Sequence, residues 1–145
     1  MSFALITGNS GAAALFGDVF PECGTAAADN IRNITAPECA VIFGEDCRRA
    51  PRQTRALAAV ISSDSSFDTS GLVGVQVITC GASGKNTVSV TSRTADSMTL
   101  SLNRSIQTLR GICEPLELPV PAPADADAYD YMAAFAASLA LGLIG

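Results

Sequence analysis

The sequence contains no histidine and no tryptophan, and only nine of its residues are basic. Without histidine the chain lacks the usual general base, the Ser-His and Cys-His pairs of nucleophilic enzymes, and the commonest zinc ligand. Fourteen acidic residues bring the net charge to −5, which argues against a protein whose whole surface attracts nucleic acid. These absences favour a structural protein over an enzyme.

Cysteines are few and scattered, and no two of them are separated by only two residues. Zinc and thioredoxin-like sites need such C-x-x-C pairs, so neither is expected. We interpret most of the thiols as buried, and an odd number leaves at least one for a bond between subunits. The five are Cys23, Cys39, Cys47, Cys80 and Cys113.

Three patterns that superficially suggest a ligand site have simpler explanations. Residues 81–87, Gly-Ala-Ser-Gly-Lys-Asn-Thr, are too short for a phosphate loop and precede a strand pattern. Asp125, Asp127 and Asp130 open a helix, where the helix dipole favours carboxylates, and they lack calcium-loop spacing. Asn33-Ile-Thr and Asn103-Arg-Ser match a glycosylation triplet, which arises often by chance. We therefore expect no cofactor and no metal ion.

The length of 145 residues predicts one domain, 1–145, with a substantial core. Apolar residues make up 48% of the chain, which favours assembly because one monomer would hide that much apolar surface poorly. The apolar run after Asp130 falls short of the roughly 20 residues that span a bilayer. No Lys or Arg precedes Arg32, so the start lacks the charged region of a signal peptide and we expect a cytoplasmic protein.

The first part of the chain, 1–71, reads as strands and loops. Within residues 1–20 we expect two short strands about the turn at 8–11, and the alanine run at 12–16 of the second one would also suit a helix. Further on we expect a strand at Ala40–Phe43, another at Thr54–Ser62 and a loop at 64–71. Four arginines within eight positions, 48–55, form a cluster that is more typical of a solvated or interface surface than of a binding site. They are Arg48, Arg49, Arg52 and Arg55.

Residues 72–121 give the clearest sheet signal. Leu72–Cys80 and Asn86–Ser92 flank a glycine-containing turn, which predicts a β-hairpin. Two further strands are expected at Met98–Leu102 and Ser105–Ile112. The strand 113–121 contains three prolines, which lack the N–H that a central ladder needs, so it should lie at an edge of the sheet.

The end of the chain, 124–144, predicts a helix over Tyr129–Ile144 with Asp125 as its N-cap. This helix has almost no polar side, and a helix that is apolar all round must be buried. Because one sheet covers only one side, we expect a second subunit to cover the other. The expected dimer interface comprises Tyr129, Met132, Phe135, Ala136, Leu139 and Leu143.

The order of strands first and helix last predicts an α+β domain, with an antiparallel β-sheet of hairpins and a C-terminal helix packed on it. One face of the expected hairpin carries hydroxyls and one lysine. That pattern suits a solvent-facing sheet surface and also suits contacts to RNA phosphates and bases. The residues of this polar face are Thr79, Lys85, Thr87, Ser89 and Thr91.

Two stretches resemble the coat proteins of single-stranded RNA bacteriophages, the leviviruses. One is the expected hairpin Val75–Ser92, in which Lys85 enters the second strand, and the other is 116–125, where a proline-containing strand leads into an acidic helix start. The resemblance covers about half the chain and lies in element order and residue type. It implies antiparallel sheets paired edge to edge in a dimer, each helix lying over the partner's sheet, and Thr87 and Ser89 at positions that hold an RNA hairpin.

The sequence thus predicts a coat protein that self-assembles through homodimers into an icosahedral shell, a virion capsid packaging single-stranded RNA in a bacterial cytoplasm. The main alternative is a decoration, cement or tail protein of a tailed phage, which would attach to a shell made by another protein. An enzyme comes third, because it would depend on carboxylates such as Asp64, Asp68 and Asp96 alone.

Overall fold

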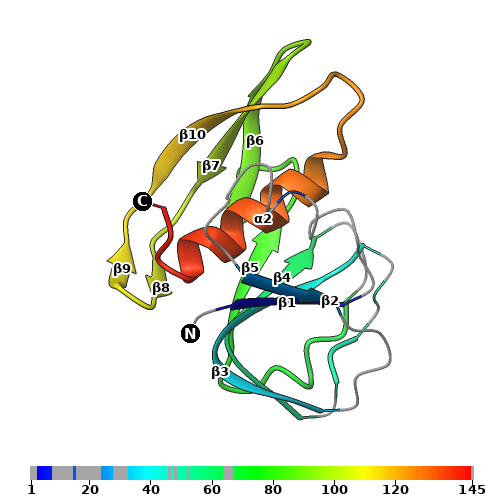
Figure 1. The fold of residues 1–145 in the computed structure, drawn as a ribbon, viewed down its shortest axis with the longest axis vertical. Helices are drawn as coiled ribbons and strands as arrows, with labels where there is room; N and C mark the ends of the chain where they lie inside the picture. The colour runs from blue at the N-terminus through cyan, green and yellow to red at the C-terminus, as the bar shows by residue number, and fades with distance from the viewer. Residues whose placement is uncertain are drawn as a thin grey trace.

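A computed structural model describes residues 3–7, 15, 24–27, 33–45, 47, 49–51, 53–63 and 67–144. It is a mostly β structure with one helix near the end of the chain, as the α+β expectation requires (Figure 1). The elements are β1 Phe3–Thr7, β2 Gly24–Ala27, β3 Asn33–Phe43, β4 Gln53–Ser62, β5 Gln76–Cys80, β6 Val88–Arg93, β7 Ser97–Leu102, β8 Ile106–Thr108, β9 Gly111–Cys113, β10 Leu116–Pro121 and α2 Ala128–Ala140.

Eight of the strands form one sheet in the order β10-β7-β6-β5-β4-β3-β1-β2, and β8 with β9 forms a separate pair. All neighbours from β2 to β6 run parallel, and only β6, β7 and β10 pair antiparallel within this sheet. The expectation of an antiparallel sheet of hairpins is therefore wrong for most of the sheet. These strand directions also differ from those that the coat-protein resemblance implies.

The hairpin expected across the turn at 81–87 does not form. β5 and β6 instead run parallel and share one bridging pair, Cys80 and Val88. The physical reason is that β5 packs on both faces: Ile78 faces the helix side, while Val77 packs against a second apolar cluster on the opposite side. Strands buried on both faces read as nearly continuous apolar runs and are typical of parallel sheets, and residues 72–80 are such a run.

A regular register connects the three long parallel strands. Ile42 pairs with Val60 and Val60 pairs with Ile78, so each step along the sheet is eighteen residues (60 − 42 and 78 − 60). The connections 44–52 and 63–75 contain no helix in their described residues, and they supply part of the second cluster. That cluster contains Ile34, Val41, Phe43, Ala50, Ala59, Ile61 and Leu72.

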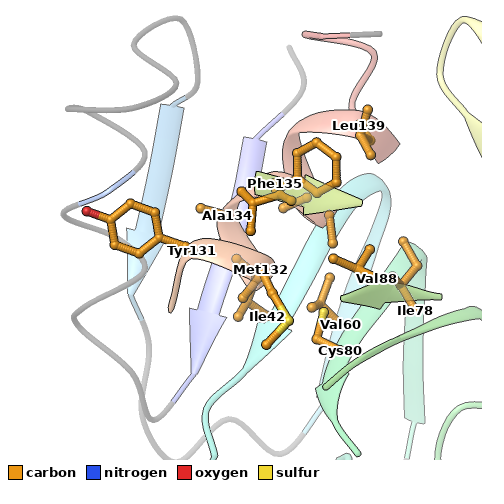
Figure 2. Close-up of a cluster of buried hydrophobic side chains, with 14 of the residues drawn as sticks. Ile42, Val60, Ile78, Cys80, Val88, Tyr131, Met132, Ala134, Phe135 and Leu139 are labelled. Atoms are coloured by element: carbon orange, nitrogen blue, oxygen red, sulfur yellow. The ribbon is translucent and has the colours of Figure 1, made fainter. Parts of the chain in front are cut away.

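Helix α2 lies across the other face of the sheet (Figure 1). It begins with Asp127 as N-cap, whose side chain accepts a hydrogen bond of 3.1 Å from the Tyr129 N–H, so the expected cap at Asp125 is two residues too early. Met132 points towards Ile42 and Val60, whereas Tyr131 points away from this group (Figure 2). Residues 131–141 are nevertheless all buried within the one chain.

The helix ends at Ala140, four residues before the expected end. Gly142 adopts a positive φ of 72°, and its N–H donates to the Leu139 carbonyl at 3.0 Å. The N–H of Leu143 donates to the Ser138 carbonyl at 2.9 Å. This pair of bonds is a Schellman motif, which glycine permits because it has no Cβ to oppose the left-handed conformation.

Several other expectations can be compared directly with the strands. Strands are present at the expected places in β1, β3, β4 and β7, and β10 lies at an edge of the sheet as its prolines predict. The single strand expected over 105–112 is instead the antiparallel pair β8 and β9. Of the second N-terminal strand expected over 12–16, only Leu15 lies among the described residues, and it is helical.

Candidate nucleic-acid interface

The expected polar face divides into a buried and an exposed part. Thr87 and Ser89 are buried, with 5% and 2% of their surface exposed. The Thr79 hydroxyl is partly buried and accepts a hydrogen bond of 3.1 Å from the Thr87 N–H. Lys85 and Thr91 are exposed. Only Lys85 and Thr91 of this set are therefore open to a ligand, while Thr87 and Ser89 lie beneath the surface, and RNA binding by the whole set stays a prediction.

Asn103, which directly follows β7, forms hydrogen bonds to β6, to β7 and to the turn before β6. Its side-chain amide donates to the Asn86 carbonyl at 3.0 Å and to the Ser89 hydroxyl at 2.9 Å. Its side-chain oxygen accepts from the Ser101 hydroxyl at 2.8 Å, and its backbone N–H donates to the Thr87 carbonyl at 2.8 Å. Because buried polar groups cost free energy unless they are paired, this network explains how the hydroxyls of Ser89 and Ser101 can lie inside the protein.

The next residue, Arg104, brings a second cation beside Lys85. Its guanidinium donates to the backbone carbonyl of Lys85, so the two exposed basic residues lie together at one end of β6 and β7. Arg104 is absent from the set expected from sequence. The sequence does contain a signal for it, because Arg104 directly follows a clearly predicted strand, where an exposed basic residue can be expected. The triplet Asn103-Arg104-Ser105 also matches a glycosylation pattern, which hides that signal.

The six side chains of the expected dimer interface lie on α2 or just after it. Five of them, including Phe135 and Leu139, are buried within this one chain, and Leu143 is partly buried. The helix therefore needs no second subunit to cover it, so the reason for expecting that interface no longer applies. Dimerisation stays a prediction that must rest on other surfaces.

The largest exposed apolar side chains in the described part of the chain include two on the β8–β9 pair. Ile112 is 68% exposed and Leu109 is 38% exposed. Beside them lies a hollow of about 330 Å³ between β9 and the end of α2, with Leu143, Ile144 and Arg110 in its lining. The Leu109 N–H donates to the Ala140 carbonyl at 3.0 Å, which holds the turn of the pair against the helix end. We call these four apolar residues, Leu109, Ile112, Leu143 and Ile144, the hairpin patch.

Two described thiols and one tyrosine have pKa values that burial raises. Burial raises the pKa of the Cys80 thiol and of the Tyr129 hydroxyl, which donates to the Phe43 carbonyl. Burial and then the neighbouring Glu114 raise the pKa of Cys113. None of the four described cysteines forms a disulfide with another described residue. Raised pKa values make thiols poorer nucleophiles at neutral pH.

A second hollow of about 430 Å³ opens beside Arg49, Asp68 and Ser70 in the connections below β3 and β4. The Ser70 N–H donates to the Asp68 carboxylate at 2.9 Å, and this bond, then the Ser70 hydroxyl and then Arg49, lowers the pKa of Asp68. Of the other arginines in the expected cluster, Arg55 is exposed on β4, and Arg48 and Arg52 lie outside the described residues.

Searches with family models, among curated proteins and among solved structures found no match to this chain. Within the described residues, no group of three or more histidine, cysteine or carboxylate side chains is placed to hold a metal ion. None of the helices described here is long and apolar enough to cross a membrane.

Proposed function

We propose that this protein is a capsid subunit, a structural protein that assembles with copies of itself into a shell around single-stranded RNA. The observation that supports self-assembly best is the hairpin patch. Ile112 and Leu109 project from a strand pair that is held against the helix end, beside a hollow with further apolar lining. Ile112 lines this hollow together with Leu143 and Ile144, and exposed apolar side chains grouped around a hollow are typical of a contact between proteins.

The free edge of β10 argues against assembly by strand pairing there. The Ala122 N–H donates to the Asp96 carbonyl at 3.0 Å, so even-numbered residues turn their backbone groups towards β7. Pro119 and Pro121 therefore face away from β7, and neither has an N–H to offer to another chain. Proline at an exposed edge prevents pairing between sheets. The proposed contact is accordingly made by side chains of the hairpin patch and not by the sheet edge that the coat-protein resemblance implies.

The test is the size of the expressed protein, measured by light scattering after gel filtration and by electron microscopy. Wild type should form closed shells, and Ile112→Asp should shift the population towards small species because it places a charge in the contact. Val73→Asp is the matched control: Val73 is 88% exposed, lies in the connection before β5 and is not a residue of the hairpin patch. It should assemble as wild type does.

Two results would contradict the proposal. A monodisperse wild-type monomer at micromolar concentration would remove self-assembly altogether. Stable trimers or hexamers that never close into shells would instead favour the decoration or cement protein of a tailed phage. Equal effects of Ile112→Asp and Val73→Asp would leave assembly in place but move its contact away from the hairpin patch.

A further inference from the structure

Two exposed cationic residues of this acidic protein, Lys85 and Arg104, lie next to each other, because the guanidinium of one is bonded to the backbone of the other. Lys85 and Arg104 are both exposed, and the guanidinium of Arg104 donates to the Lys85 carbonyl. Within the described residues, neither side chain forms an ion pair with a carboxylate. Like charges placed together repel one another, and an anion bound between them would relieve that repulsion.

The backbone beneath both cations is fixed by hydrogen bonds. On one side, Asn86 donates through its side-chain amide to the Ser83 carbonyl at 3.0 Å, and the Lys85 N–H donates to the Ser83 hydroxyl at 3.2 Å. On the other side, Asn103 is bonded to β6 through both its side chain and its backbone. The backbone of both residues and the guanidinium of Arg104 are thus preorganised, which lowers the entropy that ligand binding must overcome.

The chemistry of the pair fits a phosphate. A guanidinium has five N–H donors in a planar fork, and the bond to the Lys85 carbonyl occupies one of them. The remaining donors suit a bidentate contact to phosphate oxygens, while the Lys85 ammonium supplies a second point charge. We propose that Arg104 and Lys85 together bind a backbone phosphate of single-stranded RNA, an inference that rests on the RNA partner of the proposed function.

This site gives the buried hydroxyls a different role from direct RNA contact. The Ser89 hydroxyl accepts from the Asn103 side-chain amide, and the backbone carbonyl of Thr87 accepts from the Asn103 N–H, so both residues fix the position of Arg104. The Thr87 hydroxyl itself lies 3.5 Å from the Thr79 hydroxyl. Ser89 and Thr87 are positioning residues in this scheme. The contact to RNA comes from the two exposed cations, which accounts for RNA binding by a protein with a net charge of −5.

The experiment measures binding of a fluorescein-labelled 20-nucleotide oligouridylate to the purified protein by fluorescence anisotropy over a range of salt concentrations. Arg104→Ala and Lys85→Ala should each weaken binding about tenfold at low salt. Each should also make the plot of log affinity against log salt shallower by roughly 0.7 for a lost phosphate contact on a single strand. Arg104→Lys should fall between wild type and Arg104→Ala, because it keeps the charge and loses the fork.

Arg55→Ala is the matched control, since Arg55 is an exposed arginine on β4 and its loss changes the net charge equally. It should bind as wild type does, and all variants should keep the wild-type denaturation midpoint. Unchanged affinity and salt slope in both Arg104→Ala and Lys85→Ala would overturn the inference, as would equal weakening by Arg55→Ala or a wild type that binds no RNA. Assembly is measured separately. Shells that form while neither Arg104 nor Lys85 affects RNA binding would refute the phosphate site alone. RNA binding that depends on Arg104 and Lys85 without any shells would refute the capsid function alone.

Discussion

Replacing Asn103 by alanine should destabilise the protein more than any other single polar substitution in the β6–β7 network. The side chain forms three hydrogen bonds, to Asn86, Ser89 and Ser101. At about 0.5–1.5 kcal/mol each, their loss amounts to about 2–4 kcal/mol. Ser89 and Ser101 are buried, with 2% and 5% of their surface exposed, so water cannot easily replace the lost partner.

Urea denaturation followed by circular dichroism, at one protein concentration for all variants, measures this effect. With a slope of about 2 kcal/mol per molar urea, the middle of the usual range, Asn103→Ala should lower the midpoint by about 1–2 M. Ser101→Ala removes only one of the three bonds and should cost about 1 kcal/mol. A midpoint for Asn103→Ala no lower than that of Ser101→Ala would refute the view that Asn103 joins the strands.

Three further changes test other parts of the structure. Ser138→Ala should stabilise the protein by about 1 kcal/mol, because the Ser138 hydroxyl is buried with no hydrogen-bond partner among the described residues and alanine favours helix; a lowered melting temperature would contradict this. Gly142→Ala should cost about 1–2 kcal/mol, since φ is 72° and a Cβ would lie 2.7 Å from Cγ of Arg110, whereas Gly84→Ala, with nothing within 4 Å, should be neutral by the same urea assay. Asp68 has a lowered pKa in the folded state, so it contributes stability above the unfolded pKa of about 4 that is lost as the pH falls through the folded value. Asp68→Asn should therefore reduce the difference between the denaturation midpoints at pH 7 and pH 2, and an unchanged difference would show that the carboxylate is not involved.

Local chemistry was enough to predict several elements from the sequence. The prolines of 115–121 predicted an edge strand because proline has no N–H for a second neighbour, and β10 is at the edge. The apolar run of 129–141 predicted a buried helix, since no side of it can face water, and α2 is buried. These outcomes depend on each segment's own residues and hardly on its neighbours in space.

Tertiary structure alone decided which strands pair, in which direction, and which side chains become buried. A glycine-containing turn is compatible with a hairpin or with a longer parallel connection, and the burial of β5 on both faces selected the parallel one. Likewise, alternating hydroxyls are typical of a solvent-exposed sheet face, but Ser89 is buried and its hydroxyl accepts a hydrogen bond from the Asn103 side chain. The pairing of β6 with β7 also brings Arg104 next to Lys85, which is nineteen positions away in the sequence. No local sequence pattern encodes this proximity, because it depends on how the two strands pair.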